Sequence, residues 1–185
     1  QESSVNSADV PAYQDFMKQI IDQGIYIQWY DSATYPNGGV SYQNMFNDAN
    51  SPWVQDPNKG KISDSIFLNY WFSGNMLQDS ADHAKSLGID PKYAVFAGIE
   101  AGQKKFGSIA SNENYMNVNL DADGKPYVSL AALGTDFVSH ELGDDKKVYP
   151  KYQNQVFDRE RRLWTGSSTG EKGTTDISDP YIDDG

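Results

Sequence analysis

One stretch of the sequence collects residues that could bind a sugar. The segment GIYIQWYDSATYPNGGVSYQN, residues 24–44, carries an apolar run that ends in WYDS and, after a Pro-Asn-Gly-Gly turn, the letters YQN. Flat aromatic rings stack on the C–H face of a sugar, while planar amides and carboxylates make paired hydrogen bonds to its hydroxyls. The alternative is that these rings only fill a core. The candidate residues here are Tyr30, Asp31, Tyr42, Gln43 and Asn44.

The composition excludes several classes of function. The formal net charge is -11, which argues against nucleic acid or an anionic membrane as the main partner because both reward clustered Lys and Arg. No apolar run approaches the roughly 20 residues of a membrane span. Cysteine is absent, so disulfides, thiol nucleophiles and most zinc sites are excluded. We expect no metal and no other cofactor.

The first elements are a helix and a strand. Apolar residues recur at helical spacing from Tyr13 to Ile21, after Ser7 or Asp9 as a possible cap and Pro11 in the first turn. Gly24 stands where a helix commonly ends. Residues 25–30 then alternate with period two, which predicts a strand whose last residue is Tyr30.

The same order of elements recurs along the chain. Further strands are predicted over Ser63–Phe72, Tyr93–Glu100 and Val128–Leu133. Strand starts roughly 30–40 residues apart are typical of β/α units. No glycine-rich phosphate fingerprint follows a strand, which disfavours a nucleotide-binding sheet. Four strands are half of what a (β/α)8 barrel needs.

The sequence therefore predicts an α/β fold that is the C-terminal half of a (β/α)8 TIM barrel. Residues 1–165 would hold strands five to eight with their helices, and residues 166–185 would be a flexible tail or linker. Helices are also expected between the strands: one with Asn75 as its cap, one from Gln103 onward, and one over Tyr152–Leu163.

Functional residues of such barrels lie where the strands end. Beyond Tyr30 and Asp31, these positions hold Asn69, Tyr70, Trp71, Glu100 and Asp136. Polar and aromatic groups thus collect at one mouth of the barrel, although any strand that leaves a core can end in such residues. Two other signals are weaker. Asn119–Gly124 imitates part of a calcium loop but lacks its final Glu, so a β-turn is expected there, and His83 is expected to be solvated.

Four segments, at this spacing and in this order, resemble the second half of the catalytic barrel of glycoside hydrolase family 85. They are WYDS with YQN, DSIFLNYWF, YAVFAGIE and DGKPYVSLAAL, and the resemblance covers roughly Tyr13 to Trp164. It implies an endo-β-N-acetylglucosaminidase that cleaves the GlcNAc-β-1,4-GlcNAc core of N-linked glycans. It also implies retaining, substrate-assisted hydrolysis, in which the substrate's 2-acetamido carbonyl attacks the anomeric carbon while a Glu protonates the leaving sugar.

The resemblance assigns roles to this half of the barrel. Tyr30 would be the catalytic phenol that hydrogen-bonds the acetamido group or its oxazoline, and Asp31 would orient neighbouring groups. Tyr42 stands where the family usually has Trp and would stack on a sugar. The other substrate-binding positions are Gln43 and Asn44, as sugar contacts or loop anchors, Asn69, the pair Tyr70 and Trp71 lining the acetamido pocket, and Glu100, where the family commonly has Asp.

The catalytic pair of the family, Asn-x-Glu, occurs nowhere in these 185 residues. The resemblance places it upstream, so the N-terminal half of the barrel, from the same precursor or a companion chain, is an expected partner beside the glycan or glycoprotein substrate. A non-catalytic glycan-binding module and a purely structural fragment remain alternatives. The acidity, the absence of cysteine and the Asn- and Tyr-rich composition suggest a secreted or cell-surface bacterial protein, and a cytoplasmic one is compatible.

Overall fold

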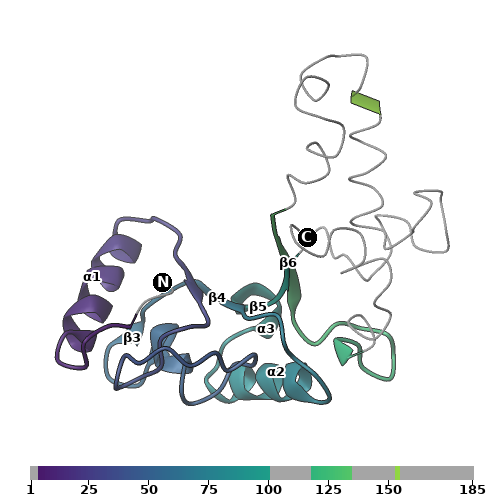
Figure 1. The fold of residues 1–185 in the computed structure, drawn as a ribbon, viewed down its shortest axis with the longest axis horizontal. Coiled ribbons are helices and arrows are strands. Elements are labelled where there is room, and N and C mark those ends of the chain that lie inside the picture. The colour runs from purple at the N-terminus through teal and green to yellow at the C-terminus, as the bar shows by residue number, and fades with distance from the viewer. Residues whose placement is uncertain (1–3, 101–117, 135–152, 155–185) are drawn as a thin grey trace. The chain divides into compact units, whose positions relative to one another are not determined.

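A computed structural model describes residues 4–100, 118–134 and 153–154 (Figure 1). The helices are α1 (Val10–Asp22), the 3-10 helix η1 (Ser51–Trp53), α2 (Met76–Ser86) and α3 (Pro91–Ala94). The strands are β1 (Gln28–Tyr30), β2 (Gln55–Asp56), β3 (Gly60–Lys61), β4 (Ser65–Leu68), β5 (Val95–Glu100) and β6 (Ser129–Leu133). The chain divides into two compact units, and the first contains residues up to Gly98 with Tyr127–Ala131. The predicted boundary at residue 165 stays a prediction.

Four strands form one sheet in the order β1-β4-β5-β6. β1 pairs with β4 in parallel, with Trp29 opposite Ile66, and β4 pairs with β5 in parallel, with Phe67 opposite Phe96. The parallel pairing, with α2 and α3 between β4 and β5, confirms the predicted α/β class. Because the carboxyl ends of parallel strands meet at one edge, Tyr30 and Leu68 end β1 and β4 on the same side of the sheet.

The strands are shorter than the sequence predicted. Residues 25–27 lie outside β1, and Ile25 and Tyr26 are exposed. At Ile27 the carbonyl accepts the backbone N–H groups of Asp64 and Ser65, but the N–H donates to the side-chain carboxylate of Asp64 at 2.8 Å. Residues 69–72 lie beyond β4, and residues 93–94 belong to α3, which begins where the Asp90 side chain accepts the Lys92 N–H.

Asp64 is held ionised at this junction. Burial acts to raise its pKa, but the hydrogen bond from Lys61, the Ile27 N–H and the positive charge of Lys61 outweigh it, and the pKa is lowered. A lowered folded-state pKa stabilises the fold above the unfolded-state pKa, and this contribution is lost as pH falls through the folded-state value.

We expect Asp64→Asn to lower the melting temperature of the full-length protein slightly at neutral pH. The difference from wild type should shrink to nothing in acid, because both proteins are then uncharged at residue 64. Thermal unfolding across pH measures this, and Lys61→Met should reproduce it by removing the partner charge. A difference that persists unchanged in acid would contradict the assignment.

α1 follows its predicted pattern with one exception. Pro11 is in the first turn, Met17 is buried, and Gly24 has a φ of 77° just after the helix. Asp9 is the N-cap residue but makes no side-chain cap hydrogen bond. Phe16, expected on the inner stripe, is 56% exposed, whereas the polar Gln14 is 1% exposed.

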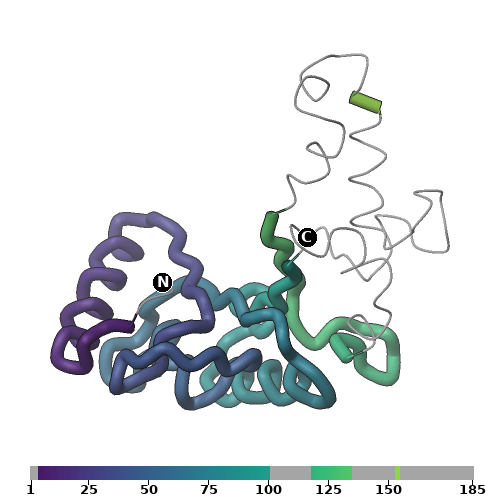
Figure 2. Tube along the Cα trace, viewed as in Figure 1, coloured from purple at the N-terminus to yellow at the C-terminus, as the bar shows by residue number. Residues whose placement is uncertain are grey.

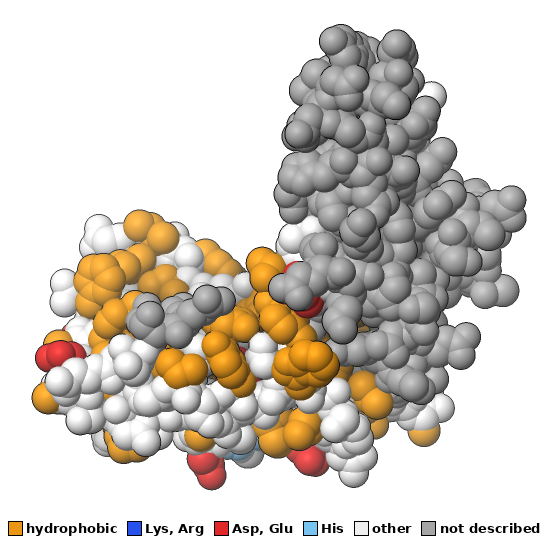
Figure 3. Space-filling view, viewed as in Figure 1, with side chains coloured by type: hydrophobic (Ala, Val, Ile, Leu, Met, Phe, Trp, Pro, Cys, Tyr) orange, Lys and Arg blue, Asp and Glu red, His pale blue; other side chains and the backbone are white. Residues whose placement is uncertain are grey.

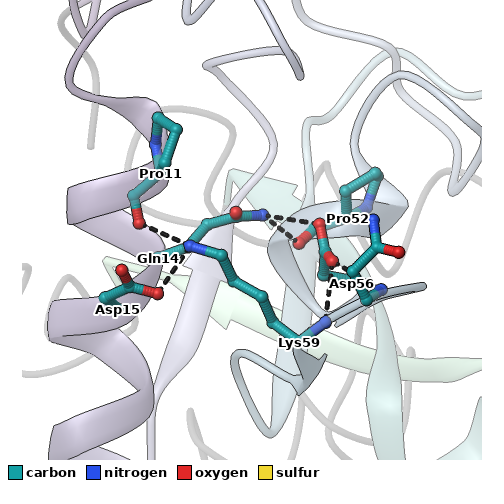
Figure 4. Close-up of polar contacts among 7 residues, drawn as sticks. Pro11, Gln14, Asp15, Pro52, Asp56 and Lys59 are labelled. Atoms are coloured by element: carbon teal, nitrogen blue, oxygen red, sulfur yellow. Dashed lines mark hydrogen bonds and ion pairs between the residues drawn. The ribbon is translucent and has the colours of Figure 1, made fainter.

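Gln14 is buried because it joins α1 to the β2–β3 hairpin (Figure 4). Its Nε2 donates to the carbonyl of Pro52 at 2.9 Å and to Oδ2 of Asp56 at 3.3 Å. The Lys59 ammonium donates to the Pro11 carbonyl and pairs with Asp15 on the same helix. These contacts fix the helix against a hairpin that is 40 residues further along the chain or more.

We expect Gln14→Ala to destabilise the fold by about 1–3 kcal/mol, since it leaves a buried carbonyl and a buried carboxylate without this donor. Gln19→Ala, on the exposed face of the same helix, should change stability by less than about 0.5 kcal/mol. Thermal unfolding of the two variants makes the comparison. Equal destabilisation by the two substitutions would show that the buried hydrogen bonds of Gln14 contribute no more to stability than an exposed side chain does.

α2 confirms its predicted inner stripe, as Leu77, Ala81 and Ala84 are buried. Asn75 is the N-cap residue, although its side chain makes no cap hydrogen bond.

The prediction that His83 is solvated is wrong. Its side chain is 19% exposed and its ring packs edge-on against Phe46, with centroids 5.2 Å apart, because the loop that contains Phe46 covers this face of α2.

The segment between β1 and η1, residues 31–50, contains no helix or named strand and folds back on itself (Figure 2). Ala33 and Val40 form an isolated antiparallel bridge, and the Phe46 N–H donates to the Ser80 hydroxyl on α2 at 2.8 Å. The bridge joins two parts of the segment to each other, and the bond from Phe46 attaches the segment to α2. The segment carries YQN, and its conformation therefore decides where those side chains lie.

In the second unit, the expected β-turn is confirmed: the Asp121 carboxylate accepts the N–H groups of Asp123 and Lys125, and Leu120 bridges Pro126. Asp136, the start of the helix expected from Gln103 onward and the tail at 166–185 lie outside the described residues. Of the helix expected over Tyr152–Leu163, only 153–154 are described, and both are helical. None of the described helices is long and apolar enough to cross a bilayer.

Candidate functional site

The candidate site is built around the buried carboxylate of Asp31, one residue past β1. Asp31 is 1% exposed. One oxygen accepts the Gln43 N–H at 3.2 Å and the Asn50 side-chain amide at 3.0 Å. The other accepts the Asn44 N–H at 2.7 Å and the Asn69 N–H at 3.4 Å. A single carboxylate therefore ties the 41–50 loop and the segment after β4 to the end of β1.

Burial of this carboxylate disfavours its charged form. Burial raises the pKa of Asp31 above its usual value, and the four hydrogen bonds from Asn50, Gln43, Asn44 and Asn69 offset only part of that rise. Asp31 is enclosed by protein donors, which is the arrangement that an orienting role requires.

A second set of hydrogen bonds joins Tyr30 to two amides. The Tyr30 hydroxyl donates to Oδ1 of Asn69 at 3.0 Å, and Nδ2 of Asn69 donates to Oδ1 of Asn44 at 2.8 Å. The Trp71 backbone N–H also donates to Oδ1 of Asn44, at 3.2 Å. Tyr30 and Asn69, which the sequence placed where strands end, thus meet Asn44 from the 41–50 loop at the carboxyl end of the sheet.

Asn44 has a special backbone as well as a bridging side chain. Its φ is 57°, in the left-handed region that Asn tolerates better than most residues other than Gly. This conformation lets its N–H reach Asp31 while its side chain reaches Asn69.

Two aromatic rings, those of Tyr42 and Phe67, contact the ring of Tyr30. The ring of Tyr30 lies 6.0 Å from that of Tyr42 and 5.8 Å from that of Phe67, which in turn lies 5.9 Å from Tyr70. Tyr42 and Trp71 are 43% and 66% exposed, and Figure 3 shows hydrophobic side chains gathered on one face of the described part. Exposed rings beside buried amides suit a ligand with both apolar faces and hydroxyls.

Two other predicted positions have different surroundings. Gln43 is held inside its own loop: its Nε2 donates to the Ser41 carbonyl at 2.7 Å, and its Oε1 accepts from Asn47 at 3.2 Å. Of the two roles that were open for it, these contacts favour a loop anchor. Glu100 is the half-buried last residue of β5 and falls in the second unit, so its place relative to Tyr30 stays a prediction.

Comparison with known proteins decides the family. The model of glycosyl hydrolase family 85 matches residues 1–183. The chain belongs to glycosyl hydrolase family 85. Its membership confirms the resemblance that the WYDS, YQN and NYW segments indicated, and it makes Tyr30 and its neighbours candidate parts of a glycoside hydrolase.

The fold agrees with this family 85 assignment. The crystal structure of the glycoside hydrolase domain of Endo-D from Streptococcus pneumoniae R6 superimposes with a TM-score of 0.71 at 24% sequence identity. The match covers 90% of this chain and 25% of that one, so the chain corresponds to a fragment of the glycoside hydrolase fold. No curated protein matches the chain.

Sequence reasoning missed three residues of the candidate site. Asn50 is a fourth donor to Asp31, and Phe67 supports the Tyr30 ring. Gly98 on β5 makes room for the Phe67 ring, because a Cβ at residue 98 would lie 2.3 Å from Phe67 Cε1 and 2.2 Å from the Leu68 carbonyl oxygen. The alternating pattern of β4 could have indicated Phe67, but no local signal marks Asn50 or Gly98.

Proposed function

We propose that this chain is part of an endo-β-N-acetylglucosaminidase that cleaves the GlcNAc-β-1,4-GlcNAc core of N-linked glycans. The chain spans a quarter of the solved relative, and no Asn-x-Glu pair occurs in its sequence. The proposal therefore assigns the general acid and the orienting Asn to the half of the barrel outside these residues.

The observation that carries the proposal is the convergence of Tyr30, Asn69 and Asn44 beside exposed aromatic rings, in a chain of family 85. A phenol held by an amide suits the recognition of an acetamido group, which has both a hydrogen-bond donor and an acceptor. Tyr42 and Trp71 offer apolar surface for sugar rings or the acetamido methyl group.

In the proposed reaction, the acetamido carbonyl oxygen of the substrate attacks the anomeric carbon, and the C1–oxygen bond to the leaving sugar breaks as the general acid protonates it. Water then opens the oxazolinium intermediate with overall retention. The internal nucleophile replaces one of the two carboxylates of the common retaining scheme. The contribution of Tyr30 is to hold the acetamido group in line, which acts mainly through proximity.

The test is to incubate the natural full-length protein with a high-mannose glycoprotein and to determine the molecular mass of both products by mass spectrometry. We expect free oligosaccharide and a protein that retains one N-acetylglucosamine at each site. Release of the whole glycan, or of single outer sugars, would overturn the proposal. Tight glycan binding without cleavage would instead support a non-catalytic glycan-binding module, which the absence of Asn-x-Glu from this chain keeps as the second candidate.

A further inference from the structure

The orientation of the Asn44 amide is fixed by two backbone groups. Its Oδ1 accepts the Trp71 N–H at 3.2 Å, and its Nδ2 donates to the Tyr42 carbonyl at 3.4 Å. A backbone N–H can only donate and a backbone carbonyl can only accept. Exchanging the oxygen and nitrogen of the Asn44 amide would therefore break both contacts.

The orientation of the Asn44 amide determines that of the Asn69 amide, which in turn determines the direction of the hydrogen bond from Tyr30. Since Oδ1 of Asn44 is an acceptor, the group of Asn69 that faces it at 2.8 Å must be the donor, Nδ2. The carbonyl oxygen of the Asn69 amide then faces the Tyr30 hydroxyl at 3.0 Å. Only the phenol has a hydrogen for this contact, so Tyr30 is the donor.

We propose that Asn44 and Asn69 are positioning residues that commit the Tyr30 hydroxyl hydrogen to Asn69, so that Tyr30 acts as a hydrogen-bond acceptor toward the substrate. A phenol has one hydrogen, and any further hydrogen bond to its oxygen must come from a donor. The substrate group that Tyr30 recognises then carries an N–H or an O–H. The part played by the substrate rests on the proposed function, whereas the orientation of Tyr30 does not.

Burial makes this arrangement rigid. Asn69 is 5% exposed, and its backbone N–H is bonded to Asp31, which prevents the side chain from moving away with the loop. If the Asn69 amide turned by 180°, the Tyr30 hydroxyl could rotate and accept from it, but the amide oxygen would then face Oδ1 of Asn44, a contact between two acceptors. The contact with Asn44 therefore fixes the orientation of the Asn69 amide.

Asn69→Asp in the full-length enzyme tests the direction of these bonds. The ionised aspartate still accepts from Tyr30 but meets Oδ1 of Asn44 with an acceptor, so kcat/KM on a high-mannose glycopeptide should fall about tenfold at neutral pH. The protonated acid restores the donor, and activity relative to wild type should recover as pH falls. The ionisable groups described around residue 69 are Asp31 and Tyr30, and the charge of Asp31 favours protonation of the new acid.

Asn69→Leu is the matched control, because it fills similar space and can make neither bond at any pH. Its loss of activity should be independent of pH. Parallel pH profiles for the Asp and Leu variants, or a Leu variant as active as wild type, would overturn the inference.

A second readout requires no activity. The Raman Fermi doublet of tyrosine distinguishes a hydroxyl that donates from one that only accepts, and subtracting the spectrum of Tyr30→Phe from that of wild type isolates residue 30. We expect a donor signature that Asn69→Leu abolishes. An acceptor-only signature in wild type would overturn the inference. A donor signature in a protein without glycosidase activity would uphold the orientation and refute the proposed function.

Discussion

Replacing Tyr30 with Phe is expected to lower kcat of the full-length enzyme about a hundredfold, with a much smaller change in KM. Loss of one preorganised hydrogen-bonding group that acts in the transition state typically has an effect of this order. Phenylalanine keeps the ring contacts with Tyr42 and Phe67 and removes only the hydroxyl that is bonded to Asn69. Steady-state hydrolysis of a high-mannose glycopeptide measures both constants.

The control for this prediction is Tyr26→Phe. The Tyr26 hydroxyl donates to Ser65 at 2.7 Å, away from the carboxyl end of the sheet, so its removal tests the loss of a tyrosine hydrogen bond without touching the site. We expect near wild-type kcat for this variant and an unchanged melting temperature for Tyr30→Phe. Equal activity of Tyr30→Phe and wild type would remove Tyr30 from the catalytic step.

Replacing Asp31 with Ala is expected to destabilise the domain by roughly 2–4 kcal/mol and to abolish the organised site. The substitution removes the acceptor of three backbone N–H groups and of the Asn50 amide. Each buried donor left unpaired costs about 1–3 kcal/mol. The total is smaller than their sum, because the variant no longer buries a carboxylate whose pKa burial raises. Calorimetry of the full-length protein should show the domain's transition at a lower temperature.

Asp48→Ala provides the comparison for Asp31. Asp48 belongs to the same loop, but its side chain is fully exposed, and its removal should leave the melting temperature within the range of ordinary surface substitutions. If the two variants have the same melting temperature, the four hydrogen bonds to Asp31 do not hold the loop in place, and other contacts must do so.

Local pattern was enough to predict α1, α2, the four strands of the sheet and the edge of the sheet where candidate residues gather, but not η1, α3 or the β2–β3 hairpin. The apolar stripe from Leu77 to Ala84 and the glycine ends of two helices are properties of neighbouring residues, and they predicted α1 and α2 well. Strand lengths were overpredicted: at the start of β1, for example, the Ile27 N–H bonds to the side chain of Asp64, and only the Ile27 carbonyl bonds to the neighbouring backbone. The residues next to Ile27 give no sequence signal for a contact with Asp64, which is 37 residues away.

The sequence by itself determined the α/β class, the family, the presence of Tyr30 and Asn69 where strands end, and Asn44 as a candidate in the loop after the first strand. Only the tertiary structure decided that Asp31 binds a loop 12–19 residues away, that Gly98 makes room for Phe67, and that the Tyr30 hydroxyl donates rather than accepts. Periodicity reports which way a side chain faces, because that depends on the local backbone alone. The direction of a hydrogen bond depends on partners up to 39 residues apart, and folding alone brings them together.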